Sequence, residues 1–524
     1  MIGCFYIGFS TKIEGVGNIT KRGVPMNIET FLSLDATEMA TLIRKKEVSA
    51  KELMEIAFKR LEEVQPALNI VTHTRKEQAL KEAENLSIEN APFNGVPILM
   101  KNISQSIEGE PLTAGSKLLQ GNMSKVDSYF VKRFRDAGFH FMGHTNTPEF
   151  ALKNITEPKL YGPTRNPWNK EFSPGGSSGG ASAAIASGVV PLAGASDGGG
   201  SIRIPASFTS LFGLKPTRGR TPVGPGVGRQ WQGASIDFVL SKSVRDSAAM
   251  LDVLQVVQPE AAYQTPLFTE NYKETMVKPF KKPLRIAFST KSPVGTPVSK
   301  DARIAVENLV KVLESEGHYV EEVDGPVDGV QLMKDYYLMN SGEMNATIIG
   351  MEHALGRELT AEDMEMESWV LNQAGKSVSA AMYSESLASW DKAAEQMVNF
   401  HRMYDLYITP TTASTAPSIG ELTPNKEKHK RYVEEISKVR NVEEQQQIVY
   451  DMFLPSLTYT PFTQLANLTG QPAMSVPVYL SENGLPLGVQ VMAQKGEEHC
   501  LLQLAYQLEQ SDLWVGMKGN PYFQ

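Results

Sequence analysis

The chain has 524 residues, of which 41% are hydrophobic and 21% charged, a balance typical of a soluble globular protein. Its formal net charge of −8 argues against nucleic acid or an anionic membrane as partner, and no apolar run reaches the roughly 18 residues of a membrane span. The two cysteines cannot build a disulfide framework, so we expect a cytoplasmic protein.

The first 25 residues show no helical periodicity, and their apolar stretch is too short for a signal peptide. The run Lys21–Gly23 can be encoded by a ribosome-binding sequence a few codons before a start at Met26. We therefore interpret residues 1–25 as an extension that is not native, the alternative being a genuine flexible extension. The domain itself is expected over residues 26–524.

Two capping-box patterns, at Asp35 and Ser49, open helices in the first part of the chain, and we expect Pro66 to end the second helix. The apolar run Val96–Met100 predicts a buried strand. Lys101 stands at its C-terminal end, where the sites of α/β proteins cluster.

A helix is expected at Tyr129–Arg135 and a strand at Phe139–Met142. His144 follows this strand, and we interpret it as a loop residue without a chemical role, the alternative being that it lines the site.

The stretch from Ser173 to Arg203 holds two glycine-serine clusters, Gly175–Gly180 and Gly198–Ser201. The segment between them is rich in Ala, Val, Ile and Leu, which predicts a buried helix and a buried strand and not a flexible linker. Serines on glycine turns beside bare N–H groups can supply the nucleophile and the oxyanion donors of acyl transfer. Composition alone leaves a packed turn and a catalytic turn equally open.

After Arg203, a stretch dense in Gly and Pro predicts ordered loops, and residues 330–400 are Met- and Tyr-rich and mainly helical. We expect a cap facing the substrate over about residues 330–450, although ordinary helix packing would also explain the methionines. Further elements are expected as helix 243–254, strand 284–288, helix 301–316, strand 484–491 and helix 497–510.

Taken together, these motifs resemble the amidase signature family, serine hydrolases with a Ser-Ser-Lys triad. Ser177 in GGSSGG and Ser201 in DGGGSIRIP are spaced as in that family, and Gly95–Lys101 matches its lysine motif. Further matches follow in the family's order over roughly residues 30 to 510: GHTNTPEF, GPTRNPW, FGLKPTRGR, YDLYITPT and NLTGQPAMSVPV.

The resemblance implies that Ser201 is the nucleophile, that Ser177 relays its proton across a cis peptide position, and that Lys101 is the final base. An ordinary lysine, with a pKa of about 10.4, is protonated at neutral pH, so burial has to lower the pKa of Lys101. The backbone N–H groups of Gly198, Gly199, Gly200 and Ser201 are expected to form the oxyanion hole.

Ser178 is expected to support this network. Asp197 and Arg203 are interpreted as an ion pair or as turn anchors, the alternative being a catalytic role. The family commonly has Asp after its lysine, and Asn102 stands there in this chain; whether this changes the pKa of the lysine stays open. A Ser-His-Asp triad is the rival chemistry, but no histidine lies in a partner motif and no G-x-S-x-G elbow is present. Without an HExxH motif or a cysteine cluster, we expect no metal and no cofactor.

These observations predict an α/β protein, one large amidase-signature domain with a mixed β-sheet flanked by helices on both faces. The predicted activity is hydrolysis of a small-molecule carboxylic amide to acid and amine or ammonia through an acyl-enzyme. The alternative enzyme is the glutaminase component of the multi-subunit glutamyl-tRNA(Gln) amidotransferase, and the non-enzymatic alternative is a binding module. Whether the chain forms a homodimer stays open.

The stretch Gly219–Phe238 resembles the branch of the family that contains 6-aminohexanoate cyclic-dimer hydrolase. Trp231 within it, together with the Met- and Tyr-rich residues 330–385, predicts a pocket for an uncharged, mainly aliphatic acyl chain.

Overall fold

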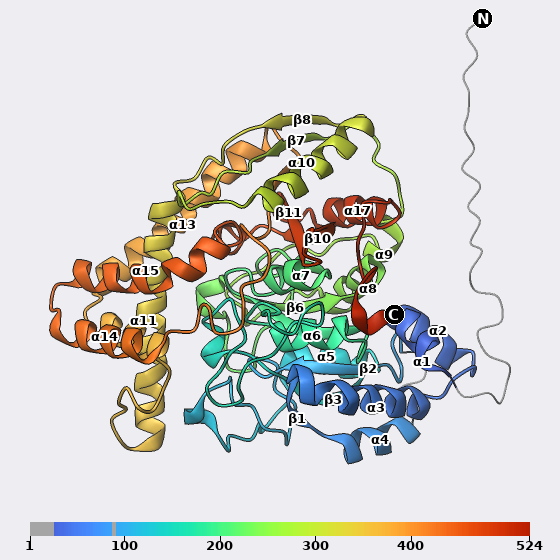
Figure 1. Ribbon diagram of the computed structural model, residues 1–524, viewed down its shortest axis with the longest axis horizontal. Coiled ribbons are helices and arrows are strands. Elements are labelled where there is room, and N and C mark those ends of the chain that lie inside the picture. Colours follow the sequence, from blue (N-terminus) through green and yellow to red (C-terminus); the bar gives the residue numbers. More distant parts are fainter. Residues whose placement is uncertain (1–25, 86–90) are drawn as a thin grey trace, which may run out of the picture.

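The computed structural model describes residues 26–85 and 91–524, and the predicted extension over residues 1–25 lies outside the described residues. Within these ranges one sheet of eleven strands has the order β1-β3-β2-β4-β6-β5-β10-β11-β9-β7-β8 (Figure 1). The strands are β1 (Val71–Thr74), β2 (Pro97–Lys101), β3 (His140–Thr145), β4 (Leu192–Asp197), β5 (Phe212–Lys215), β6 (Ile236–Ser241), β7 (Arg285–Phe288), β8 (Tyr319–Glu322), β9 (Leu406–Pro410), β10 (Ala473–Leu480) and β11 (Pro486–Ala493).

The sheet is mixed because its flanks and its middle pair differently. Strands β3, β2 and β4 are parallel on one flank, and β9, β7 and β8 on the other. The strands between β4 and β9 pair antiparallel, as does β1 at the edge. The predicted α/β class with a mixed sheet is confirmed.

Helices flank this sheet (Figure 1), and all residues of the inner strands β2, β4 and β5 are buried, whereas the edge strands β1 and β8 are partly exposed. The helices outside residues 329–459 are α1 (Ile28–Ser33), α2 (Ala36–Arg44), α3 (Ala50–Leu68), α4 (Lys76–Glu84), α5 (Tyr129–Asp136), α6 (Gly179–Ala186), α7 (Arg203–Thr209), α8 (Val244–Leu254), α9 (Tyr272–Thr275), α10 (Lys300–Ser315), α16 (Gln464–Thr469) and α17 (Glu498–Glu509). Helix α6 packs on β4, and α7 packs on β5, β10 and β11, which places both at the centre of the sheet.

A group of longer helices lies to one side of the sheet (Figure 1). It contains α11 (Gly329–Leu355), α12 (Met366–Gly375), α13 (Ala380–His401), α14 (Lys426–Lys438) and α15 (Val442–Tyr459). Helices α11, α12, α14 and α15 share an apolar cluster that is distinct from the main core. These helices coincide with the region predicted to cap the site. None of the helices within residues 26–85 and 91–524 has the length and apolar character to cross a membrane.

Helix α3 runs past Pro66, so the prediction that this proline ends it was wrong. The proline removes one N–H donor, but the next turn still forms, with the N–H of Asn69 donating to Gln65 O at 2.9 Å. The helix ends at Leu68, and the left-handed backbone of the C-cap residue Asn69 (φ 51°) turns the chain away.

The Gly- and Pro-rich stretch after Arg203 also differs from the prediction, because it contains strand β5 and not loops alone. The four residues of β5 pair with β6 on one side and with β10 on the other. Pairing on both sides stabilises a strand that is too short to show a convincing sequence pattern.

Candidate active site

The three residues predicted to form the triad lie near the carboxyl ends of the parallel strands β2 and β4. Lys101 ends β2, and β4, which runs parallel to β2, leads into the loop Gly198–Ser201 before α7. Ser177 lies two residues before the start of α6, the helix that packs on β4. Because the carboxyl ends of parallel strands meet at the same edge, residues far apart in sequence come together here.

Lys101 is fully buried, and its Nζ donates hydrogen bonds to Ser177 Oγ at 2.7 Å and to Ser196 Oγ at 2.9 Å. Burial lowers the pKa of Lys101 to about 7, against smaller opposing effects of the Asp237 and Asp197 carboxylates. A substantial fraction of this lysine is therefore neutral near pH 7, where it can accept a proton from the hydroxyl that it contacts.

Ser196 is a residue of this network that the sequence did not reveal. Ser178, predicted to support the site, holds the Ser196 backbone: its Oγ donates to Ser196 O at 3.2 Å and accepts from Ser196 N–H at 3.3 Å. Ser196 was missed because its importance depends on the pairing of β4 beside β2, and its only sequence signal is its place next to Asp197.

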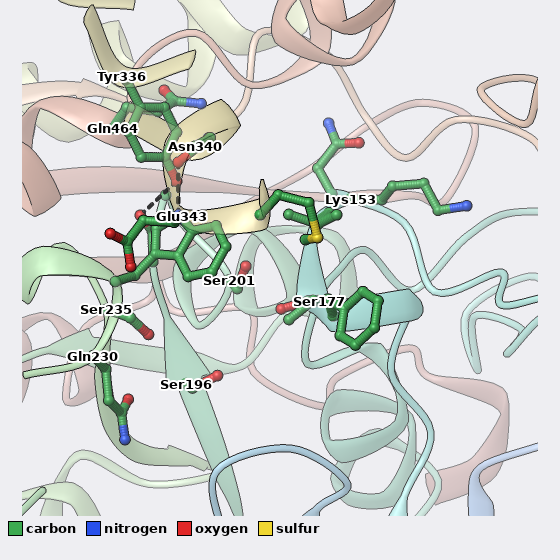
Figure 2. Close-up of a pocket in the computed structure, with 18 of the residues that line it drawn as sticks. Lys153, Ser177, Ser196, Ser201, Gln230, Ser235, Tyr336, Asn340, Glu343 and Gln464 are labelled. Atoms are coloured by element: carbon green, nitrogen blue, oxygen red, sulfur yellow. Dashed lines mark hydrogen bonds between the residues drawn. The ribbon is translucent and has the colours of Figure 1, made fainter. Parts of the chain in front are cut away.

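Ser177 and Ser201 line a common cavity of about 500 Å³. The peptide bond between Gly176 and Ser177 is cis, as the resemblance implied. In the view of Figure 2, Ser201 lies between Ser177 and the side chains of α11. Among the described residues, no hydrogen bond joins Ser201 Oγ to Ser177 Oγ, so the structure brings Lys101 and Ser177 into direct contact and places Ser201 on the same cavity.

The N–H groups predicted for the oxyanion hole are not equivalent. The N–H of Gly200 donates to Asp197 Oδ1 at 2.7 Å, so the prediction that it faces an oxyanion was wrong for this donor. The cause is the tight turn at the end of β4, in which the Asp197 carboxylate bonds the backbone three residues on. Within the described part of the chain, the N–H groups of Gly198, Gly199 and Ser201 donate no hydrogen bond.

Arg203 and Asp197 form a fully buried ion pair, as expected. Arg203 Nε and Nη2 donate to the two oxygens of Asp197 at 3.0 and 2.9 Å, and the guanidinium also bonds Thr463, Asn467 and Gln490. Burial raises the pKa of Asp197, but the charge and hydrogen bonds of Arg203, with help from Asn467, hold it at about 2. The pair fixes the loop that carries Ser201.

Asn102 does not face Lys101. Its amide bonds the hydroxyls of Thr72 and Thr113 at 3.0 and 2.9 Å, and its Oδ1 accepts from Thr113 N–H at 2.9 Å. The carboxylate that acts most strongly on the lysine comes instead from Asp237 of β6. Burial raises the pKa of Asp237, against hydrogen bonds that it accepts from Gln230, Ser104 and Gln105.

His144 lies in β3, and its interpretation as a loop residue was wrong. Pairing with β1 and β2 extends the strand three residues beyond the segment that its apolar pattern predicts. Its Nε2 contacts Gln105 O at 3.0 Å, and burial lowers the pKa of His144 to about 4. It does not line the cavity.

Trp231, predicted to contact substrate, lies on the cavity wall, and its Nε1 donates to Asn340 Oδ1 at 2.6 Å. Asn340 belongs to α11, which forms a further part of the cavity wall. The cavity-lining residues of α11 recur at helical spacing: Met333, Tyr336, Tyr337, Asn340, Glu343, Met344 and Thr347. Figure 2 shows Tyr336, Asn340 and Glu343 along this face. The Met- and Tyr-rich composition was the signal for this wall, but it did not identify the individual residues.

The cavity is mixed in character. Apolar side chains line much of it: Phe150, Leu152, Ile204, Trp231, Met333, Met344, Phe453 and Leu457. Three charged residues also line it: Lys153, Arg229 and Glu343. Lys153 is paired with Glu365 at 2.6 Å, and Glu343 accepts hydrogen bonds from Gln232 and Tyr383. Among the described residues, no cluster of His, Cys, Asp and Glu is arranged to hold a metal ion.

Comparison with known proteins gives consistent matches over most of the chain. A sequence model of the amidase family matches residues 52–502. A lipoamidase of Enterococcus faecalis is 42% identical over 472 residues, covering 90% of this chain and 62% of the relative, so the chain spans less than two thirds of that protein. A 6-aminohexanoate-cyclic-dimer hydrolase of Paenarthrobacter ureafaciens is 34% identical over 492 residues, covering 92% of this chain and 96% of the relative.

Solved structures agree with these relationships. A 6-aminohexanoate cyclic dimer hydrolase complexed with substrate matches with a TM-score of 0.85 and 33% identity, covering 94% of this chain and 100% of the other. The corresponding component of a glutamyl-tRNA(Gln) amidotransferase from Thermotoga maritima matches with a TM-score of 0.68 and 25% identity, covering 92% and 96%.

Replacing Arg203 by Leu should leave the buried Asp197 carboxylate without its partner. Breaking a buried pair in this way typically costs about 3–5 kcal/mol, so we expect the free energy of unfolding in urea to fall by about that amount. Arg357→Leu, which breaks an exposed pair with Asp363, is the matched control and should change little. Equal losses in the two variants would contradict the anchoring role of Arg203.

Proposed function

This chain belongs to the amidase family and is an amide hydrolase, and from that premise we propose that it cleaves an uncharged, mainly aliphatic carboxylic amide through an acyl-enzyme on Ser201. The predicted resemblance to the family and to its cyclic-dimer-hydrolase branch is confirmed. The observation that carries the proposed mechanism is the contact of a fully buried Lys101 with Ser177 at the cavity that Ser201 lines.

In the proposed reaction, Ser201 Oγ attacks the amide carbon while its proton moves to Ser177, whose own proton moves to neutral Lys101. The new Oγ–C bond places a negative charge on the carbonyl oxygen, which the N–H groups of Gly199 and Ser201 stabilise. The proton then returns from Lys101 through Ser177 to the amide nitrogen, and collapse of the intermediate breaks the C–N bond and releases the neutral amine. Water then attacks the acyl-enzyme with the same relay as base, which releases the acid and returns a proton to Ser201.

The aliphatic acyl group is supported by the cavity lining and by the relatives. Apolar side chains of α11, of residues 150–152 and of residues 453–457 surround a space of about 500 Å³. The names lipoamidase and 6-aminohexanoate-cyclic-dimer hydrolase both denote amides of aliphatic acids. We therefore propose acids of medium chain length, with residues 330–450 serving as the cap over the acyl group.

The alternative, an ammonia-supplying component of glutamyl-tRNA(Gln) amidotransferase, is less well supported. Its solved representative matches with a lower TM-score and identity than the cyclic-dimer hydrolase. Co-purification with partner proteins that stimulate glutamine hydrolysis would favour this alternative.

Ser201→Ala should remove essentially all turnover, because the proposed reaction assigns the attack on the amide carbon to Ser201 alone. Lys101→Ala and Ser177→Ala should each lower kcat by about 10²–10⁴-fold, the usual range for loss of general acid-base catalysis. Since the two act as one relay, the double variant should be little slower than either single variant in a steady-state assay. Losses that multiply in the double variant would argue against the relay.

The pH dependence should report Lys101. Because the base acts in its neutral form, kcat/KM should rise with pH along a limb centred at the lysine pKa of about 7. A p-nitrophenyl ester is a suitable substrate, since its leaving group needs no proton and slow variants stay measurable. The limb should vanish in Lys101→Ala and persist in His144→Asn, and the reverse result would identify His144 as the base.

Chain length of the acyl group should control the rate. Each buried methylene contributes about 0.8 kcal/mol, so kcat/KM should rise by up to about fourfold per methylene from acetamide to hexanamide. Trp231→Ala should flatten this series, and glutamine, with its charged head group, should be a poor substrate. A flat series in the native enzyme, or glutamine as the preferred amide, would overturn the aliphatic pocket and leave the triad proposal standing.

A further inference from the structure

Four successive backbone carbonyls of the loop before Ser201 are each held by a hydrogen bond. Asp197 O accepts from Asn467 Nδ2 at 2.9 Å, and Gly198 O accepts from the Tyr336 hydroxyl at 2.9 Å. Gly199 O accepts from Thr463 Oγ1 at 2.6 Å, and Gly200 O accepts from Ile204 N–H at 2.7 Å. The orientation of every peptide plane in the loop is therefore set by a named donor.

Fixing a carbonyl also fixes the N–H of the following residue, because the peptide unit is planar and, when trans, its C=O and N–H point in opposite directions. The donor on Gly198 O therefore orients the N–H of Gly199. This N–H has no hydrogen-bond partner among the described residues, and Gly199 lines the cavity together with Ser201. It is thus the donor whose direction depends on Tyr336.

Tyr336 differs in origin from the other three donors. Asn467 and Thr463 belong to or precede α16, and Ile204 belongs to α7. Tyr336 belongs to α11, the helix that lines the acyl cavity, and the contact joins residues 138 apart in sequence. The fit is close, because a methyl group on Gly199 would lie only 3.1 Å from the Tyr336 hydroxyl oxygen.

The same face of α11 connects Tyr336 to Trp231. Asn340, one turn further along, accepts a hydrogen bond from Trp231 Nε1 at 2.6 Å. Burial raises the pKa of the Tyr336 hydroxyl, against the opposing effect of a hydrogen bond with Asn340, so the hydroxyl keeps its proton for donation. The bond from Trp231 to Asn340 and the bond from Tyr336 to Gly198 thus connect the acyl wall to the oxyanion loop through one face of α11, on which Figure 2 shows Tyr336 and Asn340.

We propose that Tyr336 is a positioning residue that aims the Gly199 N–H at the oxyanion, and that Trp231 and Asn340 make this position depend on the acyl pocket. The inference rests on the proposed function, since it takes Ser201 as the nucleophile. An acyl group packed against Trp231 and Tyr336 stabilises the position of Tyr336 in which the Gly199 N–H points at the oxyanion. Recognition of the acyl chain then contributes to kcat as well as to KM.

The test is Tyr336→Phe, which removes only the hydroxyl, assayed with the best amide of the acyl series. We expect kcat per titrated site to fall about 10- to 100-fold, with KM changed by no more than about twofold, because a misaimed donor acts on the transition state. Hexanal, which forms a tetrahedral adduct with a serine, should bind more weakly by the same factor, whereas the product acid hexanoate should bind as before. Tyr479→Phe, which loses a 2.8 Å bond to Asp301 far from the cavity, is the matched control and should keep native kcat.

A double-variant cycle tests the connection to the acyl wall. Trp231→Phe keeps an aromatic ring but loses the Nε1 donor, so kcat should fall, and Trp231→Phe/Tyr336→Phe should be no slower than Tyr336→Phe alone. Independent, multiplying losses would overturn the coupling, and an unchanged kcat in Tyr336→Phe, or equal weakening of hexanal and hexanoate, would overturn the positioning role. Failure of a fluorophosphonate to label Ser201 in the native enzyme would instead refute the proposed function, so the two failures are distinguishable.

Discussion

The amine of Lys101 is fully buried, its hydrogen-bond partners are hydroxyl groups, and no carboxylate of the described residues bonds it directly. An ammonium group in such a place loses its hydration and gains little in return, and this imbalance brings the pKa of the lysine to about 7. Asp237 and Asp197 act on it from further away and keep the shift moderate. The packing of β2, β4 and β6 around the amine thus sets its proton affinity, and the chemistry of the site depends on that packing.

The nucleophile side of the site is stabilised in the opposite manner. Asp197 and Arg203 are equally buried, but they form a direct ion pair, and this pair keeps the pKa of Asp197 low. Their hydrogen bonds to the loop and to residues 463–490 leave little freedom to the backbone that carries Ser201. The buried charge of Asp197 is therefore stabilised by an ion pair and has a structural role. The amine of Lys101, which contacts hydroxyl groups, can exchange a proton.

Motifs in the sequence predicted the local parts of this arrangement. Lys101, Ser177, Ser201 and the Asp197–Arg203 pair lie in short segments whose glycines and polar residues define their own backbone. The sequence could not predict parts that depend on pairing between distant segments. Ser196 matters because β4 lies beside β2, His144 is in a strand because β1 and β2 pair with it, and Tyr336 reaches Gly198 across 138 residues. Even Gly200, inside a recognised motif, differs from expectation because a carboxylate side chain already occupies its N–H.

The face of α11 on the cavity carries two kinds of residue at interleaved positions. Met333 and Met344 line the space and also pack in the apolar cluster of the longer helices, and Thr347 bonds Glu343 O of its own helix, whereas Tyr336 and Asn340 hydrogen-bond other parts of the site. On α11, one set of residues therefore determines the shape of the pocket, and another set holds the hydrogen-bonded backbone beside it. Substitutions at the first set can change the range of accepted acids while the second set is retained, which gives the protein a route to diverge in substrate and gives a designer a short list of positions to vary.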